Sequence, residues 1–175
     1  MKRTILIYGT ISGTIVATFM ATAMALTSKG SDMAGSMIVG YASMMVAFLL
    51  IFVAVKNYRD KQNGGIISFG QAFKMGILIA IIGSTFYVVT WSIEYKYFLP
   101  DFMDKYSAMQ IKQVQEAGVS GTKLEEAIKS IEDSKEMYKN PFFFTLITYA
   151  EILPVGIIIT LISALILKRK IAKTA

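Results

Sequence analysis

The chain contains no cysteine and no histidine, and these two absences exclude many kinds of chemistry. Without cysteine there is no disulfide, thiolate metal site, haem attachment or cysteine nucleophile. Without histidine, Ser-His-Asp triads and imidazole metal ligands are excluded as well. A metal site would have to consist of carboxylates, carbonyls and water. We therefore expect no catalytic site, no cofactor site and no metal site in this chain.

Charged residues are scarce. They make up 17% of the 175 residues, and hydrophobic residues make up 54%. Soluble domains average about 25% charged residues. The net charge is +6, but the basic residues flank apolar runs and do not form a stripe with interleaved aromatics, as a nucleic-acid-binding surface would. The composition therefore indicates a membrane protein with no nucleic-acid partner.

Four apolar runs are long enough to cross a bilayer, which takes about 20 residues for about 30 Å of hydrocarbon. They cover roughly residues 5–26, 34–55, 75–98 and 142–167. Lipid offers the backbone no hydrogen-bond partner, so spanning segments are helices or strands of a closed barrel. These runs lack the polar-apolar alternation of barrel strands. The sequence predicts an all-α integral membrane protein, a four-helix bundle in the lipid bilayer, as one domain over residues 1–175.

Lysine and arginine indicate the orientation, because they are enriched in cytoplasmic loops. One predicted side carries most of them: Lys2, Arg3, Lys56, Arg59, Lys61, Lys74, Lys168, Arg169, Lys170 and Lys173. The opposite side carries Lys29 and Asp32 in a short turn, and the nearly neutral segment 99–140. We therefore expect both termini in the cytoplasm and an extracytoplasmic segment at 99–140.

The first span allows two interpretations. Lys2 and Arg3, an apolar run and then Ala23-Met24-Ala25 resemble a cleavable signal peptide. The run is longer than the roughly 7 to 15 apolar residues of such signals. It also carries a small residue at every fourth position, which forms a helix face suited to close packing: Gly9, Gly13, Ala17, Ala21 and Ala25. We favour retention of the span; cleavage would leave three spans.

Capping patterns predict where the helices outside the apolar core begin. Ser68 and Gln71 form a capping-box pattern, which predicts a helix start near Phe69. Because Asn63 and the two glycines that follow it favour a turn, we expect a tight loop before this start.

The segment 99–140 is expected to form a helical hairpin. Residues 118–121 contain two glycines and separate two helical stretches. Thr122 with Glu125 predicts a second capping box, with Thr122 as the N-cap. Pro141 follows Asn140 and is expected to start the last helix, since proline is favoured at a first helical position.

Glu151 is an ionisable residue near the middle of the fourth predicted span, roughly 13 Å from its outer end at about 1.5 Å per residue. A charge at such a depth costs on the order of 2.5–3.5 kcal/mol, and intramembrane acids usually face other helices. Pro154 lacks an amide hydrogen and so frees the carbonyl of Ala150. Hydroxyl side chains at similar depth could be partners of Glu151: Thr18, Ser43, Tyr87 and Thr90.

Two interpretations of Glu151 remain open. It could be a proton or cation site of a transporter, or a protonated glutamate that joins helices through hydrogen bonds. Interhelical hydrogen bonds of this kind contribute about 0.6 kcal/mol on average. Glu94 lies near the outer end of the third span beside Lys96, where we expect both side chains to reach water.

Four groups of residues carry a resemblance to a family: Tyr58-Arg59-Asp60, the run GIISFGQAFK at 65–74, Pro100-Asp101-Phe102, and Glu151, Pro154 and Gly156 with Lys168-Arg169-Lys170. In these groups the chain resembles an uncharacterised family of bacterial inner-membrane proteins, a domain of unknown function. The likeness extends over most of the chain, and GIISFGQAFK is its most specific part. The resemblance implies a four-span protein of the bacterial cytoplasmic membrane, and it supplies no activity, substrate or catalytic residue.

The sequence thus predicts a membrane protein without enzymatic activity. Our first hypothesis is that it acts through helix packing and partner contacts, as a homo-oligomer or with another membrane protein. The alternative is a small transporter or channel subunit that uses Glu151. An intramembrane enzyme is disfavoured, because histidine and cysteine are missing.

Overall fold

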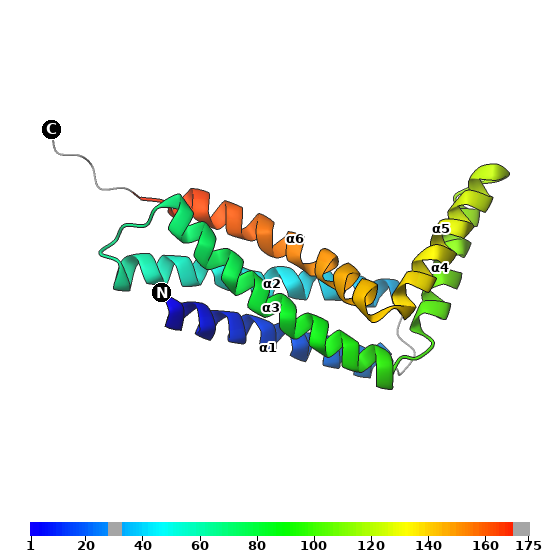
Figure 1. Ribbon diagram of the computed structural model, residues 1–175, viewed down its shortest axis with the longest axis horizontal. Helices are drawn as coiled ribbons and strands as arrows, with labels where there is room; N and C mark the ends of the chain where they lie inside the picture. Colours follow the sequence, from blue (N-terminus) through cyan, green and yellow to red (C-terminus); the bar gives the residue numbers. More distant parts are fainter. Residues whose placement is uncertain (28–32, 170–175) are drawn as a thin grey trace. The chain divides into compact units, whose positions relative to one another are not determined.

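The computed structural model describes residues 1–27 and 33–169 of the chain, with the side chains of residues 1–23 and 40–169. In these residues the protein is all-α, with the helices α1 (Lys2–Thr27), α2 (Met33–Gln62), α3 (Phe69–Tyr97), α4 (Phe102–Glu116), α5 (Thr122–Lys139) and α6 (Pro141–Leu167) (Figure 1). Some predictions lie outside the described residues: those on Lys29 and Asp32, on Lys170 and Lys173, and on the side chain of Ala25.

Four of the described helices are long and apolar enough to cross a membrane. The qualifying stretches are Lys2–Ala23, Gly40–Gln62, Phe69–Tyr97 and Pro141–Leu167. They coincide with the four apolar runs of the sequence, so the predicted fold class is confirmed. At the loop between α2 and α3 the helices extend beyond the apolar runs, because α2 continues to Gln62 and α3 already begins at Phe69. A helix does not need apolar side chains once it leaves hydrocarbon, and the Lys, Arg and Gln residues there are good helix formers.

The helix starts are partly as expected. Before α3, Gln71 Oε1 accepts a hydrogen bond from the Ser68 amide, and Ser68 Oγ accepts one from the Gln71 amide, both at 3.2 Å. The predicted capping box is therefore confirmed. At α6, Asn140 Oδ1 accepts a hydrogen bond from the Phe142 amide at 2.9 Å, and the helix starts at Pro141 as predicted.

The predicted N-cap of α5 is wrong. Thr122 is the first residue of the helix, and Gly121 is the N-cap, with φ 62° and ψ −147°. No side chain caps this end, because glycine has no side-chain acceptor to offer. A backbone with positive φ favours glycine, so the N-cap is Gly121 and not its neighbour Thr122.

The described chain divides into two compact units. The first unit comprises Met1–Trp91 and Tyr149–Ala175, and the second comprises Ser92–Thr148. The first therefore contains α1, α2 and most of α3 and α6, whereas α4 and α5 belong to the second.

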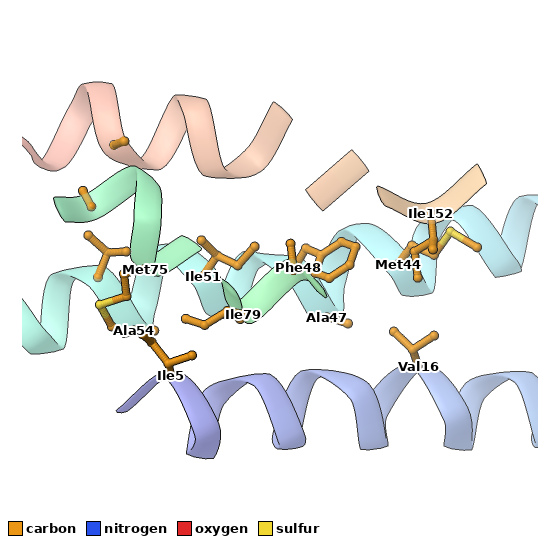
Figure 2. Close-up of a cluster of buried hydrophobic side chains, with 14 of the residues drawn as sticks. Ile5, Val16, Met44, Ala47, Phe48, Ile51, Ala54, Met75, Ile79 and Ile152 are labelled. Atoms are coloured by element: carbon orange, nitrogen blue, oxygen red, sulfur yellow. The ribbon is translucent and has the colours of Figure 1, made fainter. Parts of the chain in front are cut away.

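The first unit has a continuous apolar core to which four helices contribute (Figure 2). Among its members are Val16 of α1, Phe48 and Ile51 of α2, Ile79 of α3 and Ile152 of α6, all without solvent exposure. Lipid tails are as apolar as these side chains, so hydrophobic burial does not favour helix association inside a bilayer. Close van der Waals packing has to supply the association energy instead.

Small residues allow this close packing between α3 and α6. A Cβ atom at Gly76 would lie 2.6 Å from Thr160 Cγ2, and one at Gly156 would lie 2.7 Å from Ala80 Cβ. Residue numbers fall along α6 as they rise along α3, so the two helices are antiparallel. Gly76 and Ala80, two small residues four positions apart on α3, therefore both lie in close contact with α6.

α1 and α2 are also antiparallel. Three side-chain contacts join them at successive levels: Ser12 Oγ to the Ala47 carbonyl at 2.8 Å, Asn57 Nδ2 to Tyr8 Oη at 2.9 Å, and Thr4 Oγ1 to Gln62 Oε1 at 3.3 Å. The start of α1 therefore lies beside the end of α2, where the chain turns into α3. We call this region, with the loop 63–68 and the end of α6, the loop end of the first unit.

In the second unit, α4 and α5 pack as a helical hairpin, and this prediction is confirmed. α4 buries Met103 and Ser107, whereas α5 has no fully buried residue. An ion pair between Asp104 and Lys135 joins the two helices. The salt bridge lowers the pKa of Asp104 and raises the pKa of Lys135, because each charge stabilises the other.

Candidate functional site

Glu151 lies on α6 in the first unit, and its side chain is half-buried. Tyr87 of α3 donates a hydrogen bond from Oη to Glu151 Oε2 at 3.1 Å. Tyr41 of α2 also hydrogen-bonds the Glu151 carboxyl group. Two phenolic hydroxyls from two other helices thus meet one carboxyl group. We call Glu151, Tyr87 and Tyr41 the Glu151 cluster.

A second polar contact between α3 and α6 lies next to this cluster. The hydroxyls of Thr85 and Tyr149 are 2.9 Å apart, and Thr85 Oγ1 also donates to the Ile81 carbonyl at 2.8 Å. The Thr85 donor is therefore committed to its own helix, and Tyr149 is the donor of the interhelical bond. Like the bond between Tyr87 and Glu151, this contact joins α3 to α6.

Of the four hydroxyl residues predicted as partners of Glu151, the structure brings only Tyr87 to it among the described contacts. Thr18 Oγ1 donates to the Thr14 carbonyl at 2.8 Å, and Ser43 Oγ donates to the Gly40 carbonyl at 2.6 Å. Both bonds stay within one helix. Thr90 is half-buried on α3, one turn beyond Tyr87. Short side chains in a helix commonly bond the carbonyl of the preceding turn, and this local bond competes with partners on other helices.

Sequence reasoning missed Tyr41. Depth in the span suggested Ser43, because it lies level with Glu151. Depth does not include the reach of a side chain. A phenolic hydroxyl stands well away from its backbone, so a tyrosine two residues nearer the helix start can reach the same carboxyl group. Tyrosine within an apolar run was the signal that could have identified it.

Pro154 lies inside α6, which continues from Pro141 to Leu167. The missing amide hydrogen removes the bond to the Ala150 carbonyl, one residue before Glu151. A backbone carbonyl without its helical partner, next to a carboxyl group, can accept a hydrogen bond or coordinate a cation. The structure therefore keeps Glu151 and Pro154 together on one continuous helix.

The predicted small-residue face of α1 packs against α3 at its first two positions. A Cβ atom at Gly9 would lie 2.9 Å from Ile82 Cβ, and one at Gly13 would lie 2.5 Å from Phe86 Cγ. Further along the face, Ala17 is half-buried and Ala21 is exposed. Gly9 and Gly13 are thus used within the chain, and only the later part of the face is available to another helix.

Two buried hydroxyls also lie along α3 and α6. Ser84 and Thr160 are without solvent exposure, and neither hydroxyl has a hydrogen-bond partner within the described residues. Thr160 contacts the α3 backbone at Gly76 through its methyl group. Both side chains are small enough for close packing, which explains their position without a ligand.

Glu94 differs from the expectation. Its side chain is only 6% exposed, and Oε1 has no hydrogen-bond partner among the described atoms, whereas Lys96 is exposed. Residues two apart on a helix point to nearly opposite sides, so Lys96 can reach solvent while the Glu94 side chain is buried. The expectation that Glu94 reaches water was therefore wrong.

The loop end of the first unit contains two of the groups that carry the family resemblance, Tyr58-Arg59-Asp60 and the run at 65–74, together with Lys168 and Arg169. Arg59 donates to Asp60 through Nε at 2.6 Å and Nη2 at 3.1 Å, and to the Leu167 carbonyl through Nη1 at 3.3 Å. The loop residue Ile67 and Arg169 exchange two backbone hydrogen bonds, of 3.1 and 2.8 Å. These contacts fasten the loop between α2 and α3 to the end of α6.

The geometry defines the class of protein: it is all-α, with four described helices long and apolar enough to cross a membrane. A model of the family described as "Protein of unknown function (DUF4199)" matches residues 7–169, and the chain belongs to this family. The resemblance to a domain of unknown function is thereby confirmed. No curated protein and no solved structure matches the chain. The family description names no activity, so the function has to be argued from the residues.

Proposed function

We propose that this chain is a multi-pass protein of the bacterial cytoplasmic membrane, with both termini in the cytoplasm and the α4–α5 hairpin outside. Its exposed surface supports insertion, because large apolar side chains are exposed along all four candidate spans. They include Leu6, Ile11, Leu49, Val53, Ile81, Val89, Ile158 and Ile162. Soluble monomers rarely expose apolar patches of more than a few hundred Å².

Within the membrane the four long helices form one bundle, and the protein acts without catalysis, through helix packing and contacts with a partner. The observation that carries this proposal is the hydrogen bond between Tyr87 and Glu151, which joins α3 to α6. It gives the intramembrane carboxyl group a structural role. The exposed outer part of the α1 face, around Ala21, supports a contact with another membrane helix, in a second copy or in a different protein.

Replacement of Glu151 tests this role. Glu151→Gln keeps a side-chain oxygen that can accept the hydrogen bond from Tyr87, and adds an amide that can donate one. Glu151→Leu removes the acceptor and the donor but leaves a side chain of similar size. We expect Gln to preserve the assembled, monodisperse protein in mild detergent and Leu to lower its thermal stability. If Gln and Leu are equally harmful, the ionised carboxylate itself is needed, and the packing role is refuted.

A second candidate function is supported by the same cluster. A half-buried carboxyl group with two phenolic partners next to a proline inside the helix is also what a proton or cation site requires. Purified protein in vesicles with an imposed pH gradient tests it. Proton flux that is present in the wild type and lost in Glu151→Gln would favour transport. Absent flux, or flux unchanged by Gln, would refute transport.

A further inference from the structure

Four charged side chains converge at the loop end of the first unit. Asp60 binds Arg59 through two hydrogen bonds, and Lys56 and Arg169 also act on the Asp60 carboxylate electrostatically. One cation therefore binds this carboxylate directly, and two more are near enough to act on it electrostatically. The group as a whole keeps a positive charge that Asp60 does not neutralise.

Two of the three cations are held in place by contacts that leave binding capacity unused. Arg59 uses one N–H on each of Nε, Nη1 and Nη2, so two of the five donors of its guanidinium group remain. Arg169 is fixed through its backbone, which exchanges two hydrogen bonds with Ile67, so its side chain is not needed for the bridge. Asp60 thus acts as a positioning residue for Arg59.

Lys56 completes the cationic group. It lies one turn before Asp60 on α2, and both it and Arg169 are exposed. Within the described part of the chain, neither forms a salt bridge of 4 Å or less. Their charges are therefore available to an anion from outside the protein.

Apolar side chains continue from the cationic group along the helices. On α2, Leu49 and Val53 are 57% and 46% exposed and share a face with Lys56, at helical spacing. Towards the end of α6, Ile162 and Ile166 are 51% and 63% exposed. A cationic group next to exposed apolar helix surface matches the two parts of a phospholipid, a phosphate headgroup and acyl chains.

We propose that Lys56, Arg59 and Arg169 bind the headgroup of an anionic phospholipid, whose acyl chains lie on the exposed apolar faces of α2 and α6. Guanidinium groups match phosphate oxygens in geometry, and lysine adds a point charge. The proposal rests on the membrane insertion proposed above and adds a specific lipid partner to it.

Native mass spectrometry of the full chain in mild detergent tests the site, with phosphatidylglycerol and phosphatidylcholine of the same acyl chains as probes. We expect phosphatidylglycerol to be retained and phosphatidylcholine not. In the variant Lys56→Gln/Arg169→Gln, retention should fall about 25-fold, about fivefold for each cation removed. The backbone bridge at Arg169 survives this change, so the fold should be unaffected. Lys123→Gln/Lys129→Gln on α5, both exposed, is the matched control.

The outcomes separate the proposals. Equal retention of the two lipids by the wild type, which needs no variant, would overturn the lipid site. An equal loss in the α5 control would also overturn it, because it would show attraction to net charge only. Displacement of the lipid by millimolar inorganic phosphate would assign the site to free phosphate. Protein that is dispersed without detergent would refute the membrane insertion itself, whatever the lipids do.

Discussion

Tyr87 donates its hydroxyl hydrogen to Glu151 Oε2 at 3.1 Å, and this bond joins α3 to α6 inside the first unit. Six residues beyond Pro154 on α6, the helices meet through close contact between small residues, because Thr160 lies against Gly76. A hydrogen bond and close packing therefore join the same pair of helices at different levels. The two kinds of contact lead to separate predictions.

A double-mutant cycle measures the coupling free energy between Tyr87 and Glu151. Tyr87→Phe and Glu151→Ala each remove one partner, and we expect a favourable coupling of about 0.6 kcal/mol, with an upper limit of about 1.7 kcal/mol, between them. Reversible unfolding in mixed micelles provides the free energies. Tyr97→Phe combined with Glu151→Ala is the control, because Tyr97 is 68% exposed, and this pair should show no coupling. A coupling near zero for Tyr87 would remove its role in joining the helices.

Close packing between α1 and α3 predicts a strong dependence on residue size at Gly13. In Gly13→Ala the new methyl group would lie 2.5 Å from Phe86 Cγ. Phe86 must move, and we expect destabilisation of about 1–3 kcal/mol, as for other overpacked sites. Gly40→Ala on α2 is the control, since no atom of the described residues lies within 4 Å of its new methyl group, and it should be neutral or stabilising. Thermal unfolding followed by Trp91 fluorescence compares the two; equal effects would contradict the close contact.

The ion pair of the α4–α5 hairpin predicts a pH dependence of known sign. Asp104 has a lowered pKa in the folded protein, so its contribution is present above the ordinary value of 3.8 and is lost as pH falls through the lowered pKa. Lys135 has a raised pKa, so its contribution is present below 10.5 and is lost as pH rises through the raised pKa. At neutral pH both contributions are intact.

Hydrogen exchange of α4 and α5 in the whole protein, corrected for the intrinsic exchange rate, measures this dependence. We expect Asp104→Asn to lower protection at pH 7 by a small amount, because both side chains are partly solvated. The difference from the wild type should vanish once pH falls below the lowered pKa of Asp104. Lys112→Gln removes a more exposed pair with Glu116 at 3.7 Å and should change little at any pH. A difference that persists in acid would contradict the assignment.

The helices were predictable from the sequence because their signals are local. Run length identified the four candidate spans, and proline at 141 and the Ser68–Gln71 pattern identified two helix starts. The start of α5 was misplaced by one residue, because Thr122 matched the capping pattern while the backbone needed glycine before it. Local composition cannot say which of two neighbouring candidates takes the N-cap conformation.

The candidate site was less predictable, because it depends on how side chains from distant segments meet. Tyr87 was identified from depth, but Tyr41 was missed, and Thr18 and Ser43 bond within their own helices. Glu94 was expected in water and is buried, since a linear sequence does not show which face of a helix other residues cover. The network of Arg59, Asp60 and Arg169 joins residues about a hundred positions apart, a pairing that no local pattern encodes.

The arrangement of the chain in the membrane is the central claim, and accessibility mapping with single engineered cysteines tests it most directly. The chain has no cysteine of its own, so each introduced thiol reports one position. We expect Lys2→Cys, Asn63→Cys and Lys168→Cys to react with an impermeant reagent only after the cytoplasmic side is opened. Lys123→Cys should react in intact cells. Reaction of Lys2→Cys and Lys168→Cys from opposite sides of the membrane would contradict the account.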